Sequence, residues 1–129
     1  MAAAALGADA ERLMGNMSAL GMLFESLVVR YLRVLAQPHD GRVFHLRDAA
    51  GTEADAIVKV PDGRWLAAEV KLGGGDAIEA AARSLQRVRD NVAAERAEQL
   101  VAMVVITALG FAYTRPDGVQ VAPITALGP

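Results

Sequence analysis

The sequence predicts a domain of the α/β or α+β class, built around a mixed β-sheet. Three observations lead to this class. Apolar residues recur at helical spacing over residues 19–35 and again over residues 76–96. Between these stretches, short segments alternate apolar and polar residues, as half-buried strands do. A long apolar run over residues 99–109 is typical of a strand that is buried on both faces.

The first half of the chain is expected to contain one main helix and three strands. Residues 1–18 are expected to form only a short helical or irregular segment. The main helix begins at residue 19, and the turn-forming residues Pro38 and Gly41 follow its end. Three strands come next, at residues 42–47, 53–60 and 64–71.

The second half is expected to contain a second helix, a buried strand and a small hairpin. Asp76 is placed to cap the helix, and Glu79, three residues later, completes a capping box. After the strand at 99–109, residues 111–114 and 119–123 form the hairpin. The second helix buries one stripe of side chains, which consists of Ile78, Ala81, Ala82, Leu85 and Val88.

Length and composition exclude several classes of protein. A chain of 129 residues that is 53% hydrophobic and 22% charged fits one folded domain, here residues 19–129, and not a disordered chain. The absence of cysteine excludes disulfide scaffolds, cysteine-ligated metal sites and thiol nucleophiles. Without an apolar run of about 20 residues or a basic leader, a cytoplasmic protein with no membrane partner is expected. A net charge of −2 argues against non-specific coating of DNA.

The hairpin between residues 53 and 71 can be registered from its turn. Pro61-Asp62-Gly63 forms a three-residue loop with glycine at the left-handed position. Val60 then pairs with Arg64, which places Asp55 opposite Glu69 and Glu53 opposite Lys71. One face of the hairpin is wholly aliphatic and consists of Ala54, Ala56, Val58, Val60, Leu66, Ala68 and Val70. The opposite face gathers Glu53, Asp55, Glu69 and Lys71 at one end.

Two carboxylates that face each other across a strand pair destabilise it, so something is expected to compensate. A divalent cation would do so, because Mg²⁺ binds oxygen ligands and is commonly held by one or two carboxylates. Lys71 beside the ion would stabilise developing phosphate charge or orient an attacking water. Charged hairpin faces are also common as solvated surfaces with cross-strand ion pairs, and the pattern alone favours neither interpretation.

An acidic residue on the first helix (Glu25), an aspartate on a strand (Asp55) and Glu69-Val70-Lys71 on the next strand resemble the PD-(D/E)xK nuclease superfamily. Over most of the chain, the sequence also resembles the C-terminal domain of bacterial P-loop (AAA+-type) ATPases, called domain of unknown function 4143. The strings that carry this likeness are GMLFESLVVRYL, HLRD, GTEADA and AAEVKLG. The resemblance implies a restriction-endonuclease-like, three-layer α-β-α fold with a central mixed sheet. Its core order is α-β-β-β-α-β, plus a C-terminal hairpin.

The resemblance also implies roles for individual residues. Asp55 and Glu69 match the metal-binding acids, Lys71 matches the catalytic lysine, and Glu25 matches the helix acid that completes a site for Mg²⁺ or Mn²⁺. Gln86 falls near a position where some members carry a glutamine that contacts DNA. Glu53, Arg47 and Gln86 are expected as supporting residues of the site. The chain departs from the pattern because no proline precedes Asp55.

The expected function is therefore Mg²⁺-dependent hydrolysis of DNA, with an ATPase, a winged-helix domain or another protein as partner. The chain itself lacks a P-loop and is not the ATPase. The alternative is a catalytically silent module that binds DNA or protein, and a third interpretation is an inactive gene fragment. As an alternative to binding a metal, Glu25 forms an ion pair with Arg30 or Arg47. His45 is interpreted as an ordinary strand histidine rather than a ligand.

Overall fold

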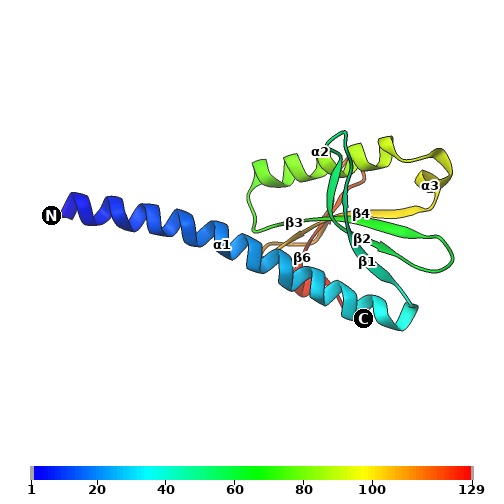
Figure 1. Ribbon diagram of the computed structural model, residues 1–129, viewed down its shortest axis with the longest axis horizontal. Helices are drawn as coiled ribbons and strands as arrows, with labels where there is room; N and C mark the ends of the chain where they lie inside the picture. The colour runs from blue at the N-terminus through cyan, green and yellow to red at the C-terminus, as the bar shows by residue number, and fades with distance from the viewer. Residues whose placement is uncertain (1, 129) are drawn as a thin grey trace.

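A mixed six-stranded β-sheet forms the centre of the domain (Figure 1). The computed structural model describes residues 2–128, with the side chains of residues 11–12 and 15–128. In the sheet, the strands lie in the order β1-β2-β3-β4-β6-β5. Their bounds are β1 Arg42–Arg47, β2 Glu53–Lys59, β3 Trp65–Lys71, β4 Leu100–Thr107, β5 Tyr113–Thr114 and β6 Gln120–Pro123. The first three strands pair antiparallel, whereas β4 runs parallel to both β3 and β6.

Helices cover both faces of this sheet, α1 on one and α2 on the other (Figure 1). The helical segments are α1 Ala2–Ala36, η1 Gln37–His39, α2 Gly75–Asn91, α3 Ala94–Glu98 and η2 Ile124–Ala126. The element order confirms the predicted α/β fold with a mixed sheet and a small C-terminal hairpin of β5 and β6. Within the described residues, no helix has the length and apolar character needed to cross a membrane.

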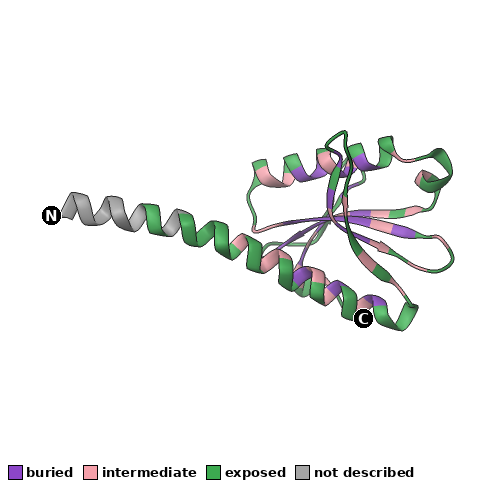
Figure 2. Cartoon of the chain, viewed as in Figure 1, coloured by how far each residue is buried: buried purple, intermediate pink, exposed green. Residues whose placement is uncertain are grey.

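The hydrophobic core lies in two halves, one on each face of the sheet (Figure 2). Leu85 and Val88 of α2 are fully buried against one face, and Val28 and Leu32 of α1 pack onto the other. Each such buried aliphatic side chain stabilises the fold by about 1.5–3 kcal/mol. The predicted stripe of α2 is confirmed, and the predicted burial of β4 on both faces is confirmed by Val105 in one core half and Ile106 in the other.

The first helix is longer than predicted. It runs without a break from Ala2 to Ala36, whereas only a short helical or irregular segment is expected before residue 19. Alanine is the best helix former, and a single interior glycine such as Gly15 costs only about 1 kcal/mol. The described side chains that precede Gly21 are all exposed, so this part of α1 makes little contact with the sheet (Figure 2).

The second helix differs at both ends. Its N-cap is Gly74, at φ 100°, and no side chain caps the helix there. The predicted capping box is therefore wrong. Asp76 lies inside the first turn, where its negative charge interacts favourably with the helix dipole. Glu79 does not cap the helix and accepts a 3.0 Å hydrogen bond from the guanidinium of Arg115. The helix ends at Asn91, and the short α3 occupies the rest of the predicted span.

The β2–β3 register is confirmed where these strands pair, from Lys59↔Trp65 to Ala56↔Ala68. Beyond this point the predicted face is wrong for Ala54 of β2, whereas Val70 of β3 stays on the predicted face with Ala68. The β1–β2 register shifts between Phe44↔Ile57 and Leu46↔Ala54, so His45 spans two residues of β2, Asp55 and Ala56. Such a β-bulge reverses the alternation of side chains along the bulged strand. Ala54 consequently packs in the core half under α2, while Ala56 packs under α1.

Candidate metal centre

The candidate centre lies at the open end of the β2–β3 hairpin, where the two strands separate. Asp55 stands in the bulge of β2 and is partly buried. Its Oδ2 accepts a 2.8 Å hydrogen bond from the backbone N–H of Val70. The carboxylate thus satisfies a strand donor that has no backbone partner on β2, and this bond fixes the carboxylate beside β3.

Glu69 of β3 lies next to Asp55 and is only 6% exposed. Burial, followed by a hydrogen bond and charge repulsion from Asp55, raises the pKa of Glu69 from 4.5 to about 9, against the opposing effect of Lys71. The ion pairs among the described residues do not include Glu69. The buried Glu69 carboxyl group therefore holds its proton more tightly than an ordinary glutamate does.

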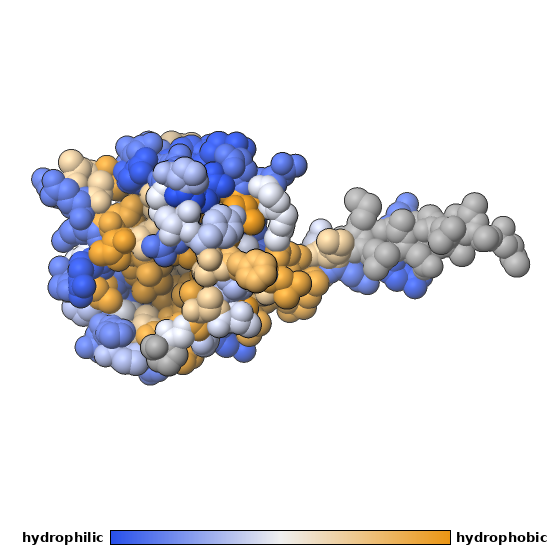
Figure 3. Space-filling view, turned by 180° about the vertical axis from the view of Figure 1, so that it is seen from behind, coloured by the Kyte–Doolittle hydropathy of each residue, from blue (hydrophilic) through white to orange (hydrophobic). Residues whose placement is uncertain are grey.

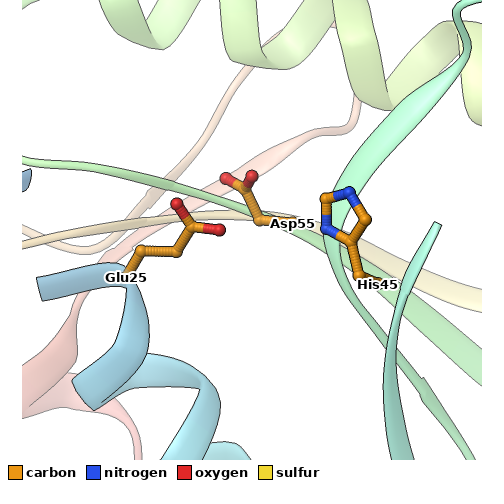
Figure 4. A group of neighbouring side chains, drawn as sticks. All are labelled: Glu25, His45 and Asp55. Carbon is orange, nitrogen blue, oxygen red and sulfur yellow. The ribbon is translucent and has the colours of Figure 1, made fainter. Parts of the chain in front are cut away.

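Glu25 approaches the same point from α1. Val28 and Leu32, on the same side of the helix, pack into the core under α1 and so hold Glu25 against the sheet. Burial and the charge of Asp55 raise the pKa of Glu25, while nearby His45 acts in the opposite direction. Figure 4 shows Glu25 and Asp55 directed toward each other, with the His45 ring on the far side of Asp55.

Three of these side chains have the spacing of a metal site. Ligand atoms of Glu25, His45 and Asp55 all lie within 4.8 Å of one another. The oxygen donors suit Mg²⁺ or Mn²⁺, and the imidazole suits transition metals. A cation here would also offset the charge repulsion from Asp55, which adds to burial in raising the pKa values of Glu25 and Glu69. The residues present therefore fit a divalent ion.

Comparison with known proteins assigns the chain to a family. The model of the family described as Domain of unknown function (DUF4143) matches residues 20–127. The chain belongs to the DUF4143 family. The predicted resemblance to that domain is thereby confirmed, while the family's description names no activity. Neither the curated proteins nor the solved structures gave a match to this DUF4143 domain.

The DUF4143 domain brings some of the predicted site residues together. Glu25 and Asp55 approach each other and Glu69 lies next to Asp55, but the group within 4.8 Å consists of Glu25, His45 and Asp55 and does not include Glu69. The charge of half-buried Lys71 acts on Glu69. The predicted strand pair of Asp55 with Glu69 is not formed, although their side chains are neighbours. The backbone pairs that β2 makes with β3 end at Ala56.

The three supporting residues lie around or away from this cluster. Glu53 Oε1 lies 3.3 Å from His45 Nε2, and exposed Arg47 is the ladder partner of Glu53. Neither Arg47 nor Arg30 makes an ion pair with Glu25 among the described residues. Gln86 of α2 donates a 2.8 Å hydrogen bond to Asp117, in the β5–β6 hairpin. The side chain of Gln86 is therefore bound to the β5–β6 hairpin rather than directed toward the cluster.

The sequence interpretation missed His45. Regular alternation places Asp55 on the face of the hairpin opposite Ala56 and Ala68, and it is Ala56 and Ala68 that pack under α1. The bulge brings Asp55 next to both His45 and Glu25. A signal was present in the sequence, because His45 alternates with Val43, which packs against the core half under α1. Only the bulge, which simple alternation does not predict, shows that Asp55 shares this side.

Proposed function

We propose that this chain is a PD-(D/E)xK-type nuclease domain that hydrolyses DNA phosphodiester bonds with bound Mg²⁺ or Mn²⁺. One observation carries the proposal. Glu69 is buried against Asp55 without a basic ion-pair partner among the described residues. Burying two neighbouring carboxyl groups is costly unless a cation pairs with them, and functional sites often carry such perturbed groups.

Each residue of the cluster has a definite task in this proposal. Asp55, Glu69 and Glu25 hold the ion from β2, β3 and α1. The ion supplies Lewis-acid stabilisation of the charge on the phosphate. Lys71 would orient the attacking water and offset negative charge as the water oxygen bonds to phosphorus and the P–O bond to the leaving sugar oxygen breaks. The leaving oxygen takes up a proton in place of the one that the water loses. The hydrogen bond from Val70 keeps Asp55 in position throughout.

A cleavage assay tests this function. Linear, supercoiled, nicked and branched DNA would be incubated with the wild type and with Glu69→Ala and Lys71→Ala, in Mg²⁺, in Mn²⁺ and in chelator. We expect metal-dependent cutting that is lost in both variants. Absence of cutting by folded wild type on every substrate would contradict the proposal, as would cutting that survives in both variants.

A second candidate function is a non-catalytic module that binds a protein partner, such as an ATPase subunit. The observation in its favour is a row of exposed apolar side chains on α1, with Leu20 54%, Leu23 68% and Leu27 54% exposed. Figure 3 shows apolar atoms gathered where α1 joins the body of the domain. This candidate predicts a folded protein that cuts no DNA, and Leu23→Ser would weaken its association with the partner without changing metal affinity.

A further inference from the structure

We infer that His45 is a ligand of the ion held by Glu25 and Asp55, and that it makes the site selective for Mn²⁺ and related transition metals over Mg²⁺. This inference rests on the proposed function, because it concerns the same ion. It extends that function by naming a specificity-determining ligand outside the set of acidic residues and lysine that defines the nuclease resemblance.

The geometry around His45 supports the assignment. Its ligand atom lies within 4.8 Å of those of both Glu25 and Asp55. Figure 4 shows a nitrogen edge of the ring turned toward Asp55. Glu53 Oε1 lies 3.3 Å from Nε2, which leaves Nδ1 as the nitrogen for the cation. A carboxylate on one ring nitrogen and a metal on the other is the usual second-shell arrangement of a ligating histidine.

The bulge explains why a histidine reaches this position. His45 spans both Asp55 and Ala56 in the β1–β2 ladder, so its ring lies beside the one carboxylate that stands in the bulge. The ion pair with Glu53 gives little reason for this placement, since both side chains are 46% exposed and exposed pairs contribute little to stability. Glu69, next to Asp55, is only 6% exposed, so a buried carboxyl group adjoins the group formed by Glu25, His45 and Asp55.

The donor set distinguishes between divalent ions. Mg²⁺ prefers oxygen ligands and keeps several waters, so it gains little from an imidazole. Imidazole nitrogen binds first-row transition metals well, and affinity rises from Mn²⁺ toward Co²⁺ and Cu²⁺. An imidazole added to the carboxylates therefore favours Mn²⁺ over Mg²⁺.

The test measures metal affinity rather than cleavage. Mn²⁺ binding would be followed by electron paramagnetic resonance, and Mg²⁺ binding by its competition with Mn²⁺, for the wild type, His45→Ala and His39→Ala. His39 is the other histidine of the chain, is exposed and lies in η1, so it is a matched control. We expect His45→Ala to weaken Mn²⁺ binding by about tenfold or more and Mg²⁺ binding by less than about twofold, with no change in His39→Ala.

A second measurement needs no substitution. With ¹⁵N-labelled histidine, sub-stoichiometric Mn²⁺ is expected to broaden the ring signals of His45 far more than those of His39. Mn²⁺ that binds with the same affinity in His45→Ala and broadens both rings equally would overturn the inference and leave the proposed function standing. A folded wild type that binds neither ion would overturn both.

Discussion

The two ends of the β2–β3 hairpin shift the pKa of a carboxyl group in opposite directions. At the turn, Asp62 accepts a 2.9 Å hydrogen bond from the backbone N–H of Arg64 and pairs with its guanidinium, and the backbone bond is the main cause that lowers the pKa of Asp62. At the open end, burial and Asp55 raise the pKa of Glu69 to about 9. One carboxyl group is stabilised as an anion by its surroundings, and the other is not.

The difference separates an end whose polar groups are matched from an end that carries an electrostatic cost. At the turn, Gly63 at φ 97° and the 3.0 Å bond from Val60 N–H to the Arg64 carbonyl close the hairpin without help. At the open end, the carboxylate of Asp55 replaces a backbone acceptor and Glu69 is left beside it. We interpret this local electrostatic cost as the mark of a cation site.

The largest expected effect compares the two lysines of the chain, Lys71 at the open end and Lys59 near the turn. We expect Lys71→Ala to lower the rate of DNA cleavage by about 100-fold or more, because it removes the cation beside the developing phosphate charge. Lys59→Ala would change the rate by less than about twofold. Equal losses in both variants, measured at saturating Mn²⁺, would show that general positive charge rather than the site drives activity.

A second prediction concerns a substitution that disrupts the turn and leaves the residues of the site unchanged. Gly63→Ala places a Cβ against the side-chain amide of Gln99 and forces alanine into the left-handed region. We expect the free energy of unfolding to fall by about 1–3 kcal/mol, measured by urea denaturation. Mn²⁺ affinity at the open end should stay the same. A parallel loss of affinity would mean that the turn positions the ligands and that the two ends are not independent.

The pH dependence of stability gives a third, smaller effect. Because the folded pKa of Glu69 is raised from 4.5 to about 9, the folded state binds this proton more tightly than the unfolded state. The associated stability is fully present below pH 4.5 and is lost as the pH rises toward 9. In chelator, we expect the melting temperature to fall over this window and Glu69→Gln to remove most of the slope. A wild-type profile that is flat from neutral to alkaline pH would contradict the burial of this group.

The smallest effect belongs to Asp62 and has the opposite sign. Its pKa is lowered, so its contribution is present above pH 3.8 and is lost as the pH falls through the folded pKa. Asp62→Asn should slightly reduce the loss of stability on the acid side and leave the alkaline slope of the wild type intact. Thermal melts of both variants over the full pH range would separate the two ends of one hairpin.

Sequence reasoning predicted the turn end well and the open end only in part. Pro61-Asp62-Gly63 determines the loop, and the loop determines the register as far as Ala56. The acids at Asp55 and Glu69 were identified by their type and spacing. Their surroundings were not, because a bulge depends on how β1 meets β2, and alternation along a single strand carries no trace of that contact.

The same limit explains the other differences. The sequence does not reveal His45 as a ligand because its partners, Glu25 of α1 and Asp55 of β2, are distant from it along the chain. Only the folded chain brings their ligand atoms within 4.8 Å of one another. The length of α1 was underestimated because helix continuation past Gly15 depends on small differences in propensity rather than on a pattern of burial. The α2 stripe, by contrast, was predicted because burial against a sheet imposes a strong periodicity.

The most direct test of the central claim is the melting temperature of the protein with increasing Mn²⁺ near pH 8, for the wild type and for Asp55→Asn. An ion that binds the folded state alone stabilises it by about 2.7 kcal/mol at 100 times its dissociation constant. We predict that Mn²⁺ raises the melting temperature of the wild type and leaves that of Asp55→Asn unchanged. A wild type whose melting temperature does not respond, or an equal rise in both proteins, would contradict a cation site at the open end of the hairpin.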